Sequence, residues 1–500
     1  MKNKKLLDSL FVPVTIIVGK LFTFIFDALL VAYYGASEIT DAFILAHALP
    51  TILFDGVANA IIVCFIPIYQ KIKNEDENQI NAYCNNTLVL AIFIGVIVSL
   101  LFTLLRSHIL GFYAKGVSPL SFMYLEKFSR IVIWAIPFIS AYSVFNAFLQ
   151  TNGSKSLGNI SQIITYIVLI ITIILSYPAE VFLAYFTVIG NILVFILLAN
   201  FSMDKGWKFS YVFNIKDEYI KFLLISAVPI FVSSLLSEIN AIVDKYYASF
   251  YATGIITSMT YGYKLGFAIQ GIIASAVMIM LFPELAKFAS QGALEKLGEM
   301  TSLAIRVISY FQYPIVIGGI LYSQNIIQLV FGHGNFNVED VTVTAKIFKI
   351  YLLGVIPMSI KHVGDKLCYS LQKNNFALYA SIASIICNII LNQILSAYFG
   401  YIGLAYATGL SLLIGCIVIF LFIYRYNHKI LKKELFLSIV QPLIPSFIML
   451  AILLISNELF INQLSKNNFL YLIVSIAVGA VSYIASVLIF QKNYLKKSIK

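Results

Sequence analysis

The sequence predicts an all-α polytopic membrane protein with about 14 transmembrane helices. We expect two six-helix lobes, related as pseudo-repeats around a central cavity, and two appended C-terminal helices. Three observations predict this fold class: a very apolar composition, a regular succession of long apolar runs, and landmarks that recur in the same order in both halves of the chain.

Composition separates the chain from soluble proteins. Of its 500 residues, 60% are hydrophobic and 11% are charged, and the mean hydropathy is +0.91, whereas soluble globular chains carry about one-quarter charged residues. The net charge of +11 could indicate nucleic acid, but the lysines lie in short hydrophilic breaks, where positive charge orients helices in a bilayer. We therefore expect one membrane domain, in contact with membrane lipids, and no nucleic-acid partner.

The apolar runs give the individual helices. A bilayer core of about 30 Å requires about 20 apolar residues per helix. The predicted spans centre near Leu21, Thr51, Ile97, Pro137, Val168, Leu193, Ser234, Ala274, Ile315, Ile356, Ile386, Leu412, Phe447 and Ser475. The first run follows a basic N-terminus but continues to about Ala32 without a small-residue cleavage site, so we expect a retained helix rather than a signal peptide.

Basic residues predict the orientation of these helices. Alternate breaks between the spans are rich in lysine and arginine, and they include both termini, the break at Lys71 and the break at Arg425. The opposite set is nearly bare, with two exceptions: the break with Arg106 and Lys115, and the break with Lys466. Because positive residues favour the cytoplasmic side, we expect both termini in the cytoplasm.

An internal repeat predicts the domain organisation. DALLVAYYG at residues 27–35 resembles DKYYASFYA at 244–252, FIP at 65–67 resembles LFP at 281–283, and LQTN at 149–152 resembles LQKN at 371–374. The offsets are nearly constant, about 216 to 222 residues. We predict an N-lobe at residues 1–210, a C-lobe at 211–428, and two appended helices with a basic tail at 429–500.

Charged residues inside the predicted spans are the candidate site residues, because a charge at mid-bilayer costs about 2.5–3.5 kcal/mol on insertion scales. The deepest lysines, Lys20, Lys264 and Lys361, would line a cavity that suits an anion such as a pyrophosphate headgroup. Further charges that could support the cavity or its gates are Asp27, Asp55, Asp244, Lys245, Asp365 and Lys366, and Glu238 also lies in the seventh span.

Structural roles are the alternative for several of these charges. Asp27 and Asp244 lie near the outer ends of their helices, where they could cap loops or pair with lysines. Lys366 could extend its ammonium to the membrane surface, and Asp365 has the i,i+4 spacing for an ion pair with Lys361. Isolated histidines predict no metal site, and without a Walker-type loop we expect neither ATP hydrolysis nor a cofactor.

Several motifs resemble one transporter family. GASEITDAF at residues 35–43, ALP at 48–50 and FIP at 65–67 resemble the N-terminal signature of MurJ/MviN-type lipid II flippases, in the multidrug/oligosaccharidyl-lipid/polysaccharide exporter superfamily. The resemblance continues through YGYKL at 261–265, LFPEL at 281–285, FGHGNFNVED at 331–340, NIILN at 388–392 and GLAYAT at 403–408. It covers the first 12 predicted spans in order.

The resemblance implies roles for particular residues. Lys20 and Lys264 fall where the family has cavity arginines, so the positive charge is kept but the bidentate guanidinium is lost. Asp27 and Asp41 match family aspartates, which implies that both are charges that support the cavity or its gates. Phe26 stands where the family has an arginine, and Phe54 and Asp55 stand where it often has paired arginines.

The function that the resemblance implies is flipping of an undecaprenyl-pyrophosphate-linked saccharide, with lipid II as the favoured substrate, across the bacterial cytoplasmic membrane by alternating access. Flipping of lipid-linked surface-polysaccharide units and cation-coupled drug export are the alternatives. We expect no enzyme, because no large polar loop is present to hold catalytic groups. A coupling ion or the membrane potential would supply the driving force.

Overall fold

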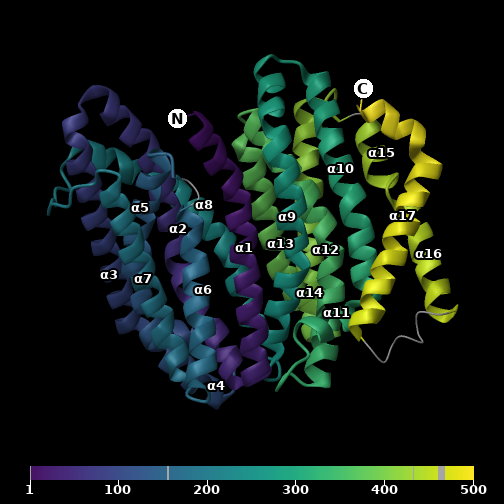
Figure 1. Ribbon diagram of the computed structural model, residues 1–500, viewed down its shortest axis with the longest axis horizontal. Coiled ribbons are helices and arrows are strands. Elements are labelled where there is room, and N and C mark those ends of the chain that lie inside the picture. Colours follow the sequence, from purple (N-terminus) through teal and green to yellow (C-terminus); the bar gives the residue numbers. More distant parts are fainter. Residues whose placement is uncertain (1, 155–156, 432, 460–467, 500) are drawn as a thin grey trace. The chain divides into compact units, whose positions relative to one another are not determined.

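The computed structural model describes residues 2–154, 157–431, 433–459 and 468–499. The described chain is built of helices joined by short loops (Figure 1). Every one of the predicted span centres lies inside a helix, which confirms the all-α polytopic fold class. The predicted break with Lys466 lies outside the described residues.

Contacts divide the chain into two compact units: residues 1–257 with 334–336, and residues 258–333 with 337–500. The helices that begin in the first unit are α1 (Lys2–Tyr34), α2 (Glu38–Glu75), η1 (Glu77–Gln79), α3 (Ile80–Tyr113), α4 (Pro119–Val132), η2 (Ile133–Ala135), α5 (Ile136–Thr151), α6 (Leu157–Ser176), α7 (Val181–Asp204), α8 (Glu218–Ala248) and α9 (Ile255–Ser290). All but the first three residues of α9 belong to the second unit.

The second unit continues with α10 (Leu294–Leu321), α11 (Ser323–Val330), α12 (Val338–Ser370), α13 (Asn374–Phe399), α14 (Tyr401–Tyr426), α15 (Lys433–Val440), α16 (Leu443–Leu459) and α17 (Asn468–Ile499). The predicted N-lobe ends at residue 210, whereas the first compact unit also contains α8, because α8 packs against α2 and α3. The predicted division follows sequence repeats rather than contacts, and the repeat stays a prediction.

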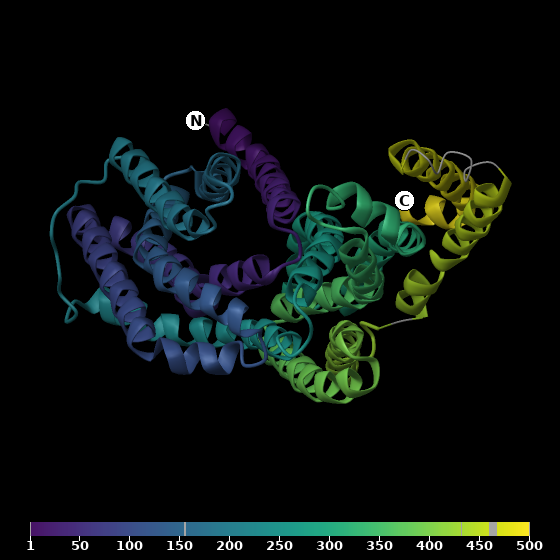
Figure 2. The same ribbon diagram turned by 90° about the horizontal axis from the view of Figure 1, so that it is seen from below.

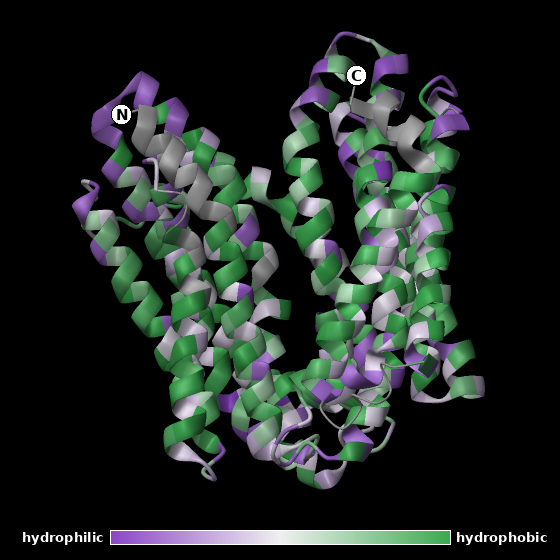
Figure 3. Ribbon diagram, turned by 45° about the vertical axis from the view of Figure 1, so that its right-hand side comes forward, coloured by the Kyte–Doolittle hydropathy of each residue, from purple (hydrophilic) through white to green (hydrophobic). Residues whose placement is uncertain are grey.

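Membrane-spanning capacity follows from length and hydropathy. Among the described residues, 12 helices are long and apolar enough to cross a bilayer, and α6 adds a shorter apolar stretch at Ile163–Ser176. Hydrophobic residues cover the middle of the helices, and hydrophilic residues gather toward many of their ends (Figure 3). Large apolar side chains such as Leu104 and Leu175 are 77% and 79% exposed, as expected for surfaces that face lipid.

The fourth predicted span consists of two helices with a turn between them. The 3₁₀ turn η2 separates α4 from α5 just before Pro137. Proline lacks the N–H that would continue the ladder and its ring crowds the preceding turn, so the α-helical pattern is interrupted there. The sequence predicted one continuous helix at this point, and the proline explains the difference.

The core of the first unit forms around α2, which contacts α4, α5 and α8. Aromatic residues from several helices pack there, and the Trp207 ring lies 4.9 Å from that of Phe148 and 5.1 Å from that of Phe145. The indole N–H of Trp207 donates to Asn85 Oδ1 at 3.1 Å. The loop between α7 and α8 is thereby fixed to α3.

In the second unit, α12 contacts both α10 and α14, and α14 packs along α13. Gly354 allows close approach of α12 to α14, because an added Cβ would lie 3.2 Å from the Cα of Gly409. The C-terminal helices α16 and α17 lie side by side (Figures 1 and 2). Helix α17 docks on α10 and α11 through Tyr483 Oη, which donates to the Tyr310 carbonyl at 2.7 Å, and through Asn468, which accepts a hydrogen bond from Asn325 at 2.8 Å.

Candidate functional site

The candidate residues of α1 lie in the first unit. Lys20 is half-buried, and Asp27, two turns further along α1, is 2% exposed. A spacing of seven residues places both side chains on nearly the same face of the helix. The structure therefore keeps a cation and a carboxylate on one side of α1.

Phe26 and Phe54, which stand where the resemblance implies arginines, are core residues. Phe26 is 3% exposed, and its ring packs against Tyr166 of α6 at 5.5 Å and Phe43 of α2 at 6.1 Å. Phe54 is fully buried in α2. Aromatic packing accounts for these departures, and any cationic contribution has to come from other positions. The side chain of Asp55 lies outside the described residues.

Asp41 caps the first turn of α9. The buried carboxylate accepts hydrogen bonds from the backbone N–H of Gly254 at 2.7 Å and of Thr257 at 2.9 Å, and from the Thr257 hydroxyl at 2.5 Å. The first N–H groups of a helix have no partner within the helix, and a carboxylate also complements the helix dipole at this end. Asp41 thus serves as an N-cap supplied by α2, more than 200 residues away in the sequence.

A pocket of about 400 Å³ opens between α2, α5 and α8 in the first unit. Its polar lining combines the Glu238 carboxylate with the side chains of Asn59, Tyr142, Ser143 and Ser234. Glu238 was visible in the sequence as a charge in the seventh span, but Asn59 and Tyr142 were not singled out, since neutral polar residues are common in membrane helices. The pocket offers several hydrogen-bond donors and acceptors around one negative charge.

Asp244 and Lys245 occupy the last turns of α8, where both are half-buried. For Asp244, this position agrees with the prediction that it lies near a helix end. A lysine in the last turn also complements the negative end of the helix dipole.

Lys264 lies on α9 in the second unit. Its side chain is half-buried, and Nζ lies 5.6 Å from the centre of the Tyr261 ring. Tyr261 is fully buried and stacks on Phe331 with ring centres 5.0 Å apart. The aromatic pair supports the lysine stem and attracts the ammonium group through a cation–π interaction.

Lys361 is held in an ion pair on α12. Its Nζ lies 3.2 and 3.1 Å from the two carboxylate oxygens of Asp365 and 3.2 Å from Ser381 Oγ on α13. An ammonium group has three donors, and these contacts engage them. Gly415 makes room for the lysine, because a Cβ there would lie 3.3 Å from Lys361 Cε. The predicted i,i+4 pairing of Lys361 with Asp365 is confirmed.

Lys366 makes contact with aromatic rings one turn further along α12. Its Nζ lies 5.7 Å from the ring centres of both Phe282 on α9 and Tyr369 on α12. The side chain is half-buried, so it is not fully extended into solvent at the end of the helix. The second unit thus holds Lys264, Lys361 and Lys366 on α9 and α12, whereas Lys20 belongs to the first unit.

Comparison with curated proteins gives consistent relatives. A protein of Buchnera aphidicola from Acyrthosiphon pisum, named probable lipid II flippase MurJ, is 23% identical over 454 residues, with 88% of each chain covered. A protein of the same name from Vibrio cholerae is 22% identical over 425 residues and covers 82% of this chain and 81% of its own.

Solved structures show the same fold. A lipid II flippase MurJ in an inward closed conformation matches with a TM-score of 0.82 at 22% identity, covering 98% of this chain and all of the other. An inward-facing multidrug resistance MATE transporter of the MOP superfamily matches with a TM-score of 0.69 at 16% identity, over 83% of this chain and 96% of its own.

A family model described as lipid II flippase MurJ matches residues 30–475. That range includes most of the helices and all the candidate charges except Lys20 and Asp27. Together with the shared fold, the match shows that the chain belongs to the MurJ family of lipid II flippases.

Proposed function

We propose that this chain is a transporter that flips lipid II, the lipid-linked saccharide precursor of peptidoglycan, across the bacterial cytoplasmic membrane. The observation that carries this proposal is the match of the lipid II flippase family model across residues 30–475. The apolar helices and half-buried lysines are what such a substrate needs, since its tail is apolar and its pyrophosphate is anionic.

Within this function, we assign headgroup binding to Lys20 and Lys264. Both are half-buried, and their charge complements a pyrophosphate. Lys361 is the weaker candidate, because its donors are already engaged by Asp365 and Ser381. We therefore assign the Lys361–Asp365 pair a structural role that joins α12 to α13.

The pathway that we propose is alternating access between two lobes that share a membrane orientation, with both termini in the cytoplasm. The internal sequence repeat supports the two lobes, and the distribution of lysine and arginine supports the orientation. Asp27, Asp244 and Lys245 lie in the last turns of α1 and α8, where they would act on opening and closing at the predicted outer side.

Rescue of cells depleted of their own lipid II flippase tests the function. The full-length chain should restore growth, and a variant with both Lys20→Ala and Lys264→Ala should not, at matched membrane abundance. The matched control is Lys287→Ala, which removes an exposed lysine from α9 and should rescue. Failure of the unmodified chain despite good expression, together with absence of lipid II flipping in vesicles, would refute the proposal.

The driving force can be tested in the same vesicles. Net export needs an energy source, and the membrane potential and a coupled cation are the two candidates. An imposed potential of 100 mV, worth about 2.3 kcal/mol per charge moved, should change the rate if charge crosses with the substrate. A rate that depends only on a cation gradient would favour ion coupling.

A further inference from the structure

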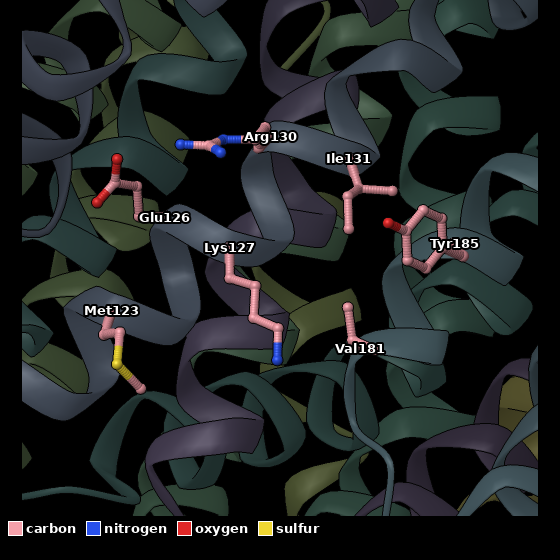
Figure 4. A pocket seen from close by; sticks show the side chains of 7 residues that line it. All are labelled: Met123, Glu126, Lys127, Arg130, Ile131, Val181 and Tyr185. Atoms are coloured by element: carbon pink, nitrogen blue, oxygen red, sulfur yellow. The ribbon is translucent and has the colours of Figure 1, made fainter.

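A pocket of about 360 Å³ lies between α4 and α7 of the first unit. The residues that line it are Met123, Glu126, Lys127, Arg130, Ile131, Val181 and Tyr185 (Figure 4). The three charged side chains come from α4, and Val181 and Tyr185 come from α7, with the Tyr185 hydroxyl directed toward α4. The pocket therefore combines a charged wall with an apolar wall that ends in a phenol.

Two ion pairs fix the charged wall. Arg106 Nη2 of α3 lies 2.7 Å from Glu126 Oε1, and Lys127 Nζ lies 2.9 Å from Glu180 Oε1, directly before α7. Each carboxylate is matched by one cation. Arg130 is exposed and has no ion pair among the described residues. One positive charge is thus in excess beside the pocket.

The ion pairs also set the depth of the pocket along the helices. The contact of Lys127 with Glu180 places this turn of α4 level with the start of α7. Arg130 lies three residues further along α4, about 4.5 Å, and Tyr185 lies about 7.5 Å from Glu180 along α7. Taking the start of the apolar span Val181–Asp204 as the outer edge of the bilayer, both residues lie at the depth of the headgroup region, where tyrosine side chains gather.

The surface around the pocket faces lipid. Met123 is 53% exposed and Tyr185 is 50% exposed, and neighbouring Phe182 on α7 is 42% exposed. Such apolar exposure in a membrane helix is covered by acyl chains. The acyl chains of a lipid whose phosphate is bound at Arg130 would run inward from it, over Tyr185 and the exposed Ile189 and Leu193 of α7.

The basic residues are unusual for this side of the membrane. The predicted orientation places the break with Arg106 on the outer side, where arginine and lysine are otherwise scarce. Positive charge on the outer side opposes the orientation signal. Binding of an anionic ligand would explain why basic residues are present there. A guanidinium recognises phosphate with two parallel hydrogen bonds, and a phenol hydroxyl can donate a third.

We propose that this pocket binds the phosphate of an anionic phospholipid of the outer leaflet, with Arg130 as the main ligand, Lys127 as a neighbouring charge and Tyr185 as a hydroxyl donor. The leaflet follows from the predicted orientation. The binding chemistry does not depend on the proposed transport function, because the pocket belongs to the first unit alone and contains none of the residues assigned to the headgroup of the transported lipid.

Native mass spectrometry of the full-length chain tests the proposal, with phosphatidylglycerol and phosphatidylcholine as probes. Phosphatidylglycerol should bind more tightly, and Arg130→Gln should weaken it on the order of tenfold, the size expected for loss of charged hydrogen bonds. Arg130→Lys should be intermediate and Tyr185→Phe should have a smaller effect. Arg425→Gln is the matched control, since Arg425 is also an exposed arginine near the end of a helix.

Two results would overturn the proposal. The first is an equal loss of phosphatidylglycerol affinity in Arg130→Gln and Arg425→Gln, which would mean that Arg130 contributes no more to lipid binding than any exposed arginine. The second is binding of an undecaprenyl diphosphate lipid that depends on Arg130 while phosphatidylglycerol does not bind, which would assign the pocket to the transported lipid. Because Arg130 has no ion pair to lose, its variants should keep the unmodified melting midpoint.

Discussion

Asp41→Ala should destabilise the first unit strongly. The substitution removes one carboxylate that accepts three hydrogen bonds, from Gly254 N–H, Thr257 N–H and the Thr257 hydroxyl. Both of these donor residues are buried, so water does not replace the lost acceptor. An orphaned buried donor costs about 1–3 kcal/mol and loss of a helix cap about 0.5–2 kcal/mol, so we expect a total of about 3–5 kcal/mol.

The assay is thermal unfolding of the purified chain in detergent, followed by tryptophan fluorescence. For a unit of this size, a loss of about 1 kcal/mol in the free energy of unfolding lowers the melting midpoint by about 2 °C. Asp41→Ala should therefore lower the midpoint by roughly 6–10 °C. Asp41→Asn keeps one acceptor oxygen and should lie between. The control is Glu38→Gln, in the same turn of α2, where the Glu38 carboxylate accepts a long hydrogen bond of 3.4 Å from the Thr253 hydroxyl.

A double-mutant cycle identifies the cause. Thr257→Val removes only the hydroxyl that donates to Asp41. It should therefore cause little further destabilisation when Asp41 is already alanine. The coupling energy should be at least about 1 kcal/mol. Equal midpoints for Asp41→Ala and Glu38→Gln, or strictly additive effects in the cycle, would refute the capping role.

Five further substitutions test packing and charge. Gly95→Ala should destabilise by about 1–3 kcal/mol, because a Cβ there would clash with Ser140 Oγ and lie 2.9 Å from Pro137 Cα. Gly111→Ala on the same helix, with nothing within 4 Å of an added Cβ, should be neutral or stabilising in the same melting assay. Lys361→Met should cost about 3 kcal/mol by leaving Asp365 without its cation, and adding Asp365→Leu should recover most of that loss; no recovery would argue against the pair. Burial raises the pKa of Glu180, but the hydrogen bond from Lys127, a backbone hydrogen bond and the charge of Lys127 together outweigh burial and lower that pKa below its ordinary value. The pair therefore contributes stability at neutral pH that is lost as the pH falls through the lowered pKa of Glu180. Glu180→Gln should remove this part of the dependence of the melting midpoint on pH. An unchanged pH dependence in Glu180→Gln would count against the pair.

Local patterns in the sequence predicted the helices well. Apolar runs of sufficient length gave span centres that all fall inside helices, because bilayer thickness sets the length of a transmembrane helix. The ion pair of Lys361 with Asp365 was also predictable from the sequence, because residues four positions apart on one helix lie on the same face. The turn before Pro137 was the kind of local break that the proline itself could have indicated.

Contacts between helices far apart in the sequence were not predictable. Asp41 and Thr257 are joined by a hydrogen bond across 216 residues, and the pairing of Lys127 with Glu180 depends on how α4 and α7 pack. Periodicity shows which face of a helix is apolar but not which neighbour covers it. For this reason Asp41 was expected to act on the cavity or its gates, and its capping contacts could only be found in the structure.

The most direct test of the central claim is flipping of fluorescent lipid II in vesicles that contain the purified chain. We predict transport by the unmodified protein and by Lys287→Ala, and an initial rate at least about tenfold lower in Lys20→Ala and in Lys264→Ala, the effect expected for loss of a charged contact with the headgroup. Unchanged rates in both lysine variants, at equal reconstitution, would contradict the assignment of these two lysines to the pyrophosphate.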